Sequence, residues 1–83
     1  EVEDNNSVQL YPNPATTHVA VSANEPITYI VIYNNLGQAL ETINAQGNTM
    51  MQLNIARLKG GLYIIGIHTE SNKWIRKHLI ISR

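Results

Sequence analysis

Turn-forming residues divide this chain into short segments, and their spacing is the sequence feature that most restricts its fold. Clusters of Asn, Gly and Pro recur about every 8–12 residues, an interval typical of antiparallel sandwiches. No stretch keeps apolar residues at the spacing of a helix face. Eleven Ile, five Val and six Thr favour strands, because a branch at Cβ suits a pleated surface better than a helix turn.

We therefore predict an all-β fold, a small antiparallel β-sandwich of about seven strands with Greek-key connections. The third and sixth segments are apolar on both faces, which is typical of strands in the middle of a sheet. Gly66 in the sixth indicates a large neighbour or a bulge. The turn at 34–37 is the clearest hairpin, since Asn and Gly both accept positive φ. The expected strands cover residues 8–11, 17–22, 27–33, 38–43, 49–55, 62–69 and 73–82.

The length of 83 residues and the mass of 9.3 kDa correspond to one domain. The absence of cysteine excludes disulfides, thiol catalysis and Cys-based zinc sites. No apolar run is long enough to cross a membrane as a helix. Residues 1–7 are polar and aperiodic, so we expect a linker there and the sandwich in residues 8–83. Because position 1 is Glu rather than Met, we expect a processed or excised chain with any export signal upstream.

The charges are divided unevenly, although the chain is neutral overall and its pI of about 7.1 argues against general nucleic-acid binding. Residues 1–56 carry five acidic side chains and no Lys or Arg. Residues 57–83 carry six basic side chains and one acidic one. Strands from the two parts could pair and neutralise each other, or the basic part could dock on an acidic partner. Both interpretations stay open.

The residues offer little catalytic chemistry. His18, His68 and His78 lack metal-ligand spacing, and a strand histidine is far more often structural. The glutamates lie in or beside turns, and a small sandwich has little cleft in which to hold a carboxylate pair. Gly60-Gly61 precedes a predicted strand rather than a helix, so it is no phosphate loop. We therefore predict a non-enzyme with no metal and no cofactor.

Four segments in order resemble a known family: residues 10–14, 32–38, 53–63 and 77–83. Together they closely resemble the C-terminal sorting domain of type IX secretion cargo, in its common form, over about residues 8–83. Each segment alone is a weak indication of the family, but four segments in order at the family spacing are a specific one. The residues that carry the motifs, mainly with structural roles, are Tyr11, Pro12, Asn13, Pro14, Gly37, Gly60, Gly61 and Tyr63.

The resemblance implies an Ig-like β-sandwich that directs cargo of Bacteroidetes-type bacteria through the outer-membrane translocon. The cargo would pass through the periplasm, and a sortase-like cysteine peptidase would then remove the domain, leaving the cargo anchored at the cell surface or released. The implied partners are translocon or shuttle proteins, the peptidase and an N-terminal cargo domain. Cleavage would fall in or beside the segment that contains Asn5, Asn6 and Ser7. Recognition is expected at Lys73, Arg76, Lys77, Leu79, Ile80, Ile81 and Arg83.

A sorting signal must be exposed while its cargo is folded, so we expect a terminal strand with free N–H and C=O groups, ending at Arg83 as the C-terminus. The alternative function is an Ig-like, non-catalytic binding or adhesion module attached to a larger secreted protein. A row of aromatic side chains on one sheet would favour that alternative, and the four tyrosines, scattered through the sequence, weigh against it. The domain is expected to be a monomer or a homodimer formed through edge strands.

Overall fold

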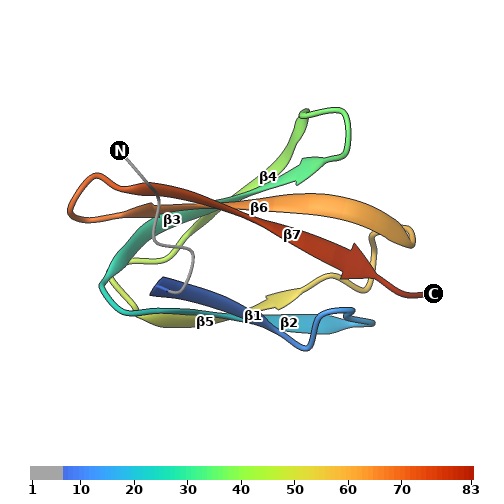
Figure 1. Ribbon diagram of the computed structural model, residues 1–83, viewed down its shortest axis with the longest axis horizontal. Helices are drawn as coiled ribbons and strands as arrows, with labels where there is room; N and C mark the ends of the chain where they lie inside the picture. The colour runs from blue at the N-terminus through green and yellow to red at the C-terminus, as the bar shows by residue number, and fades with distance from the viewer. Residues whose placement is uncertain (1–6) are drawn as a thin grey trace.

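The computed structural model describes residues 7–83, in which seven strands form two antiparallel sheets packed face to face (Figure 1). One sheet has the strand order β1-β2-β5, and the other has the order β4-β3-β6-β7. The strands are β1 (Val8–Tyr11), β2 (His18–Ala23), β3 (Ile27–Asn34), β4 (Ala39–Asn44), β5 (Met50–Asn54), β6 (Gly61–Thr69) and β7 (Trp74–Ile81).

The strand order is that of an Ig-like Greek-key sandwich, which confirms the predicted fold. Strand β2 pairs with β5, and β3 pairs with β6, so the chain crosses between the sheets after β2, β4 and β5. The two strands that are apolar on both faces, β3 and β6, lie inside the four-stranded sheet as predicted. Strands β4 and β7 form its two edges. No helix in residues 7–83 is long and apolar enough to cross a membrane.

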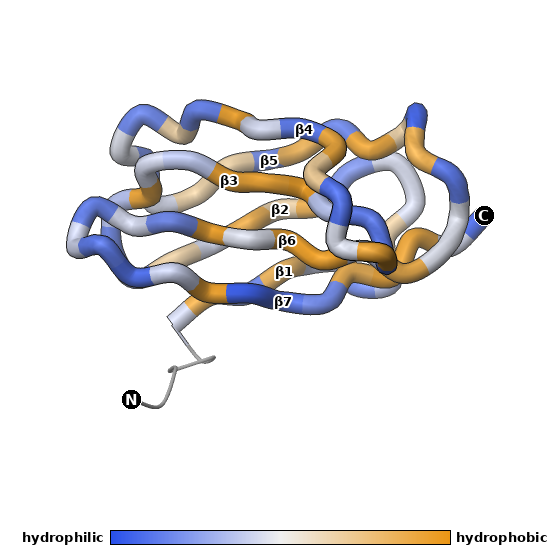
Figure 2. Tube along the Cα trace, turned by 90° about the horizontal axis from the view of Figure 1, so that it is seen from above, coloured by the Kyte–Doolittle hydropathy of each residue, from blue (hydrophilic) through white to orange (hydrophobic). Residues whose placement is uncertain are grey.

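Alternate residues of the strands fill the core between the sheets. The chain has no Phe, so aliphatic side chains supply nearly all of this core, and a fully buried Ile or Leu contributes roughly 1.5–3 kcal/mol. Figure 2 shows hydrophobic segments along the middle of β3 and β6. The largest fully buried side chains are Val8, Val19, Val21, Ile27, Ile30, Ile32, Ile55, Ile65, Ile67, Thr69 and Leu79.

The β3–β4 hairpin rises away from the body of the sandwich (Figure 1). The Asn34 side chain organises its turn, because Oδ1 accepts hydrogen bonds from the N–H groups of Leu36 at 2.9 Å and Gln38 at 3.0 Å. Gly37 takes a φ of 84°, as the predicted turn requires. The turn leaves the Leu36 side chain 79% exposed.

Candidate functional site

The candidate site is strand β7 together with the segments that hold it. Strand β7 pairs along its whole length with β6 at the edge of the four-stranded sheet, from His68 opposite Trp74 to Gly61 opposite Ile81. The aliphatic residues near the end of β7 point alternately to the two sides of the sheet. Leu79 is fully buried and Ile81 is 2% exposed, whereas Ile80 points outward and is 49% exposed.

The outer edge of β7 is covered by the segment between β1 and β2. The Asn13 side chain donates from Nδ2 to the carbonyl of His78 at 2.9 Å and accepts at Oδ1 from the N–H of Ile80 at 3.0 Å. Ala15 donates its N–H to the Ile80 carbonyl at 2.8 Å and accepts from the N–H of Ser82 at 2.7 Å. Ala15 thereby forms an isolated parallel bridge with Ile81. We call this set of four hydrogen bonds the Asn13–Ala15 clamp.

The clamp corrects one expectation. The predicted free N–H and C=O groups of the terminal strand are absent from the second half of β7, because the clamp bonds each outward-facing group from the His78 carbonyl to the Ser82 N–H. Two prolines flank Asn13 and have no N–H to donate, so the amide side chain supplies the bonds that a neighbouring strand would make. This half of the edge is closed to pairing with another strand.

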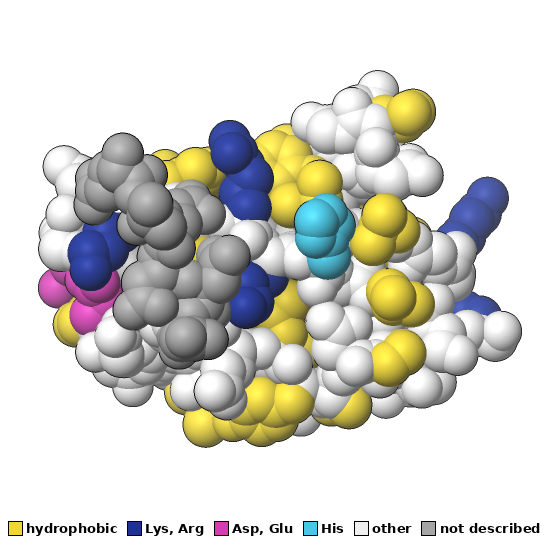
Figure 3. Space-filling view, viewed as in Figure 1, with side chains coloured by type: hydrophobic (Ala, Val, Ile, Leu, Met, Phe, Trp, Pro, Cys, Tyr) yellow, Lys and Arg dark blue, Asp and Glu magenta, His cyan; other side chains and the backbone are white. Residues whose placement is uncertain are grey.

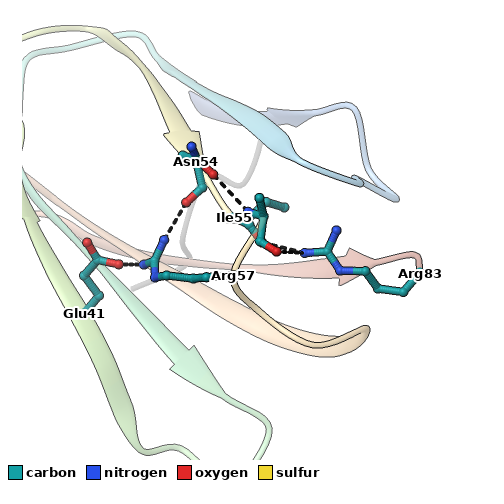
Figure 4. Close-up of polar contacts among 6 residues, drawn as sticks. Glu41, Asn54, Ile55, Arg57 and Arg83 are labelled. Atoms are coloured by element: carbon teal, nitrogen blue, oxygen red, sulfur yellow. Dashed lines mark hydrogen bonds and ion pairs between the residues drawn. The ribbon is translucent and has the colours of Figure 1, made fainter.

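Arg83 closes the same end of the sandwich (Figure 4). Its guanidinium donates to the carbonyl of Ile55 at 2.6 Å, of Ala56 at 3.1 Å and of Leu58 at 2.6 Å from Nη2 and 2.9 Å from Nε. Nη1 donates to the carbonyl of Thr16. These carbonyls belong to the β5–β6 and β1–β2 connections, where no neighbouring strand in residues 7–83 donates hydrogen bonds to them. Arg83 therefore ties the last residue of the chain to two loops.

The glycines at 60 and 61 make room for this arrangement. A Cβ at Gly60 would lie 3.0 Å from Arg83 Cγ and 3.3 Å from the carbonyl oxygen of Ile81, which is tighter than ordinary packing. Gly61 has a φ of 149°, a conformation that residues with side chains rarely adopt. The hydroxyl of Tyr63 donates to the Lys59 carbonyl at 2.7 Å and fixes the turn between them. Three motif segments far apart in sequence thus meet around Leu79 to Arg83.

The remaining predicted site residues lie elsewhere. Gly37 lies at the tip of the β3–β4 hairpin, with no neighbour near the position of an added Cβ. Tyr11, Pro12 and Pro14 are exposed beside Asn13, and Ser7 is nearly buried just before β1. Asn5 and Asn6 lie outside the described residues. Cleavage beside Asn5, Asn6 and Ser7 stays a prediction, and so does the recognition expected within residues 73–83.

The basic side chains of the site differ in their surroundings. Arg76 is exposed on the side of the four-stranded sheet that is turned away from the other sheet. Lys77 is half-buried on the opposite side of the strand, between Ile75 and Leu79, and an inward-pointing charge on an edge strand is a common device against edge-to-edge pairing. Figure 3, drawn from the side of the β1 and β7 edges, shows Lys and Arg side chains spread over this face and acidic ones at one end.

Ion pairs within the fold account for part of the charge asymmetry. Glu41 pairs with Arg57 (Figure 4), and Glu25 lies 3.3 Å from the ammonium of Lys73. The hydrogen bond from the Ser71 hydroxyl at 2.5 Å, together with the Lys73 charge, lowers the pKa of Glu25 from its ordinary value of 4.5. Both pairs join the acidic first part of the chain to the basic second part, as the internal-pairing interpretation predicts.

Aromatic side chains gather on the outward side of the four-stranded sheet. Tyr29 and His68 stack with ring centroids 4.8 Å apart, and Trp74 lies 5.9 Å from each. Gly66 lies beneath the rings of Trp74 and Tyr33, which approach the position of an added Cβ to 3.0 and 3.1 Å, so the predicted large neighbour is confirmed. The expectation of scattered tyrosines is wrong for Tyr29 and Tyr33, because they lie four residues apart on β3 and alternation along the strand places both on one face.

Sequence reasoning missed the backbone acceptors of the site. The carbonyls of Thr16, Ile55, Ala56 and Leu58 receive Arg83, but a carbonyl is common to every residue and leaves no mark in sequence. The amide of Asn13 carries a detectable signal only in its position between two prolines. Within residues 7–83 no group of three or more His, Asp or Glu could hold a metal ion.

A comparison with protein-family models matches residues 9–82 to the family described as the secretion system C-terminal sorting domain. The matched region begins in β1, contains the whole Asn13–Ala15 clamp and ends at Ser82, so it spans nearly the entire sandwich. A comparison with curated proteins finds no match.

Proposed function

The chain belongs to the family of type IX secretion C-terminal sorting domains, and from this premise we propose that it carries a cargo protein through the outer-membrane translocon and is then cut off. The family consists of non-catalytic sorting signals that interact with the type IX secretion machinery. Its members direct export toward the outer membrane or the cell surface. The observation that carries the proposal is the family match over residues 9–82.

The proposed sequence of events has three stages. The cargo crosses the periplasm with the sorting domain folded at its C-terminus, and translocon or shuttle proteins bind the domain. After passage, a sortase-like cysteine peptidase cuts the chain near Asn5, Asn6 and Ser7. The cargo is then anchored at the cell surface or released. The recognition residues proposed on the basis of the resemblance are Lys77, Leu79, Ile80, Ile81 and Arg83. Lys73 and Arg76 are added because their positive charges could meet an acidic face of the translocon.

The fold restricts how such a signal can be presented. Leu79 and Ile81 are buried in the core, and the Asn13–Ala15 clamp occupies the edge beside them. A truncation that removes residues 79–83 therefore takes away core contacts as well as the signal. An export experiment on that truncation alone could not distinguish loss of recognition from loss of folding.

The test is export of a reporter. Residues 1–83 are fused to the C-terminus of a periplasm-targeted fluorescent protein and expressed in a host with type IX secretion and in one that lacks the translocon. We expect fluorescence at the surface or in the medium only in the competent host. The intact mass of the exported reporter, measured by mass spectrometry, should place its new C-terminus near residue 7. Retention of a folded fusion in the periplasm of both hosts would contradict the proposal.

A second candidate function is an Ig-like binding or adhesion module. The aromatic cluster of half-buried Tyr29, His68 and Trp74 on one sheet favours it, because the accessible parts of aromatic rings offer stacking surfaces to ligands. The same reporter experiment separates the two functions, since a binding module would give no translocon-dependent export.

A further inference from the structure

The side of the four-stranded sheet that faces away from β1, β2 and β5 is unusually apolar. We call it the outer face. In a sandwich this small, residues on such a face alternate with core residues and are ordinarily polar. Here Leu62 is 44% exposed and Ile80 opposite it is 49% exposed. The other outward positions of β3, β6 and β7 are Tyr29, Val31, Tyr33, Ile64, Gly66, His68, Trp74, Arg76 and His78.

A hollow of about 180 Å³ lies on this face. It is lined by Tyr33, Gly37, Ile64 and Arg76. Gly66, which pairs with Arg76, lies beneath the rings of Trp74 and Tyr33, so these rings fill the space above it and Tyr33 forms one wall of the hollow. Pockets for drug-sized ligands measure roughly 300–1,000 Å³, and this hollow is smaller. Its size suits one apolar side chain of a protein partner.

Arg76 supplies the charge at the rim of the hollow. It is exposed, and within residues 7–83 its side chain has neither an ion pair nor a hydrogen-bond partner. Other basic side chains are already engaged: Arg57 by Glu41, Lys73 by Glu25 and Arg83 by loop carbonyls. No outward position of β3, β6 or β7 carries a carboxylate. The face is therefore complementary to an apolar surface that bears a negative charge.

We propose that the outer face is the surface by which the secretion machinery holds this domain, and that the partner is a protein that inserts one apolar side chain into the hollow and places a carboxylate against Arg76. This proposal rests on the proposed function. A carboxylate is the natural partner because the planar guanidinium can bind both of its oxygens. The outer face stays accessible in the folded domain, whereas Leu79 and Ile81 are buried and Arg83 is occupied.

The experiment compares four fusions of the fluorescent reporter: wild type, Arg76→Glu, Arg76→Lys and Lys59→Glu. Lys59 is also exposed and has no side-chain partner in residues 7–83, so its variant matches the change in charge away from the outer face. Each purified fusion is titrated onto outer-membrane vesicles from the competent host and from the host without the translocon. Equal urea midpoints establish that the variants are folded.

We expect Arg76→Glu to weaken binding to competent vesicles by about tenfold or more, because an attraction becomes a repulsion. The affinity of Arg76→Lys for these vesicles should fall at most severalfold, and that of Lys59→Glu should stay within about twofold of wild type. Binding of the wild type should weaken as the salt concentration rises. Ile64→Thr, which keeps a β-branched residue at the floor of the hollow, should bind severalfold more weakly than wild type. Reporter export should fall in the same order.

Suppose that the wild type is exported and that Arg76→Glu changes neither export nor vesicle binding. This result would overturn the assignment of the outer face and leave the proposed function standing. Equal wild-type binding to both kinds of vesicle would overturn the protein partner in favour of a lipid or glycan surface. Absence of wild-type export from the competent host would overturn the proposed function and this inference together.

Discussion

The side-chain Oδ1 of Asn13 accepts a hydrogen bond from the backbone N–H of Ile80 at 3.0 Å, across 67 positions of sequence. Asn13 follows β1 of the three-stranded sheet, and Ile80 lies in β7 of the four-stranded sheet. The bond therefore joins the two sheets as well as covering an edge. A strand edge that is bonded in this way cannot serve as a template for another chain.

Asn13→Ala should destabilise the domain. The variant loses both side-chain bonds of the clamp, to His78 and Ile80, and a typical net contribution per hydrogen bond predicts a decrease of about 1–2 kcal/mol in the free energy of unfolding. Urea denaturation followed by Trp74 fluorescence measures this decrease. Asn35→Ala, at an exposed turn residue whose side chain makes no hydrogen bond in the described part of the chain, is the control and should stay within about 0.5 kcal/mol of wild type.

Amide hydrogen exchange provides a local measurement of the same variant. The N–H of Ile80 should exchange faster in Asn13→Ala, since it loses its acceptor, while the N–H of Ile67 in the middle of β6 should change only with global stability. Unchanged exchange at Ile80 would contradict the clamp.

Arg83→Ala should destabilise the domain by about 2 kcal/mol, because charge-assisted hydrogen bonds are stronger than neutral ones and several are lost together. Arg83→Lys should recover part of the loss, since one ammonium cannot reach all of the carbonyls that the guanidinium binds. The measurement is again the urea midpoint. Lys59→Ala, which removes an exposed cation from the neighbouring loop, should have little effect, and a similar loss in both variants would contradict the assigned contacts.

The strands could be predicted from the sequence, but the contacts that close the sandwich could not. Alternation and turn residues are local, so the seven strands and the interior places of β3 and β6 followed from them. The clamp and the Arg83 contacts use backbone groups of residues such as Ala15 and Ile55, and the side chains of these residues give no indication that their backbone groups form such hydrogen bonds. The gathering of Tyr29, His68 and Trp74 depends on strand register, which a sequence alone does not fix.

The ion pair of Glu25 should make stability depend on pH. Its pKa in the folded state is lowered by the Ser71 hydroxyl first and by Lys73, so the unfolded state takes up a proton more readily. The stabilisation is therefore complete above the ordinary pKa of 4.5 and is lost as the pH falls through the lower folded value. Glu25→Gln should lose less stability than wild type between about pH 6 and pH 3.

Urea midpoints of wild type and Glu25→Gln across that range measure the difference. Glu70→Gln, at an exposed glutamate that has no ion pair in residues 7–83, is the control for removing one carboxylate. Identical acid dependence in wild type and Glu25→Gln would show that this pair contributes nothing.

The same substitution should reduce the free energy of unfolding much more at Ile81 than at Ile80. Ile81 is 2% exposed, so Ile81→Ser removes a core side chain and buries a hydroxyl, at a cost of roughly 3 kcal/mol or more. Ile80 is 49% exposed on the outer face, so Ile80→Ser should change the free energy of unfolding by at most about 1 kcal/mol. Denaturation of both variants tests the alternation directly. If Ile80→Ser stays folded and still reduces reporter export, the loss belongs to recognition; if Ile81→Ser is as stable as wild type, the burial of the signal strand is wrong.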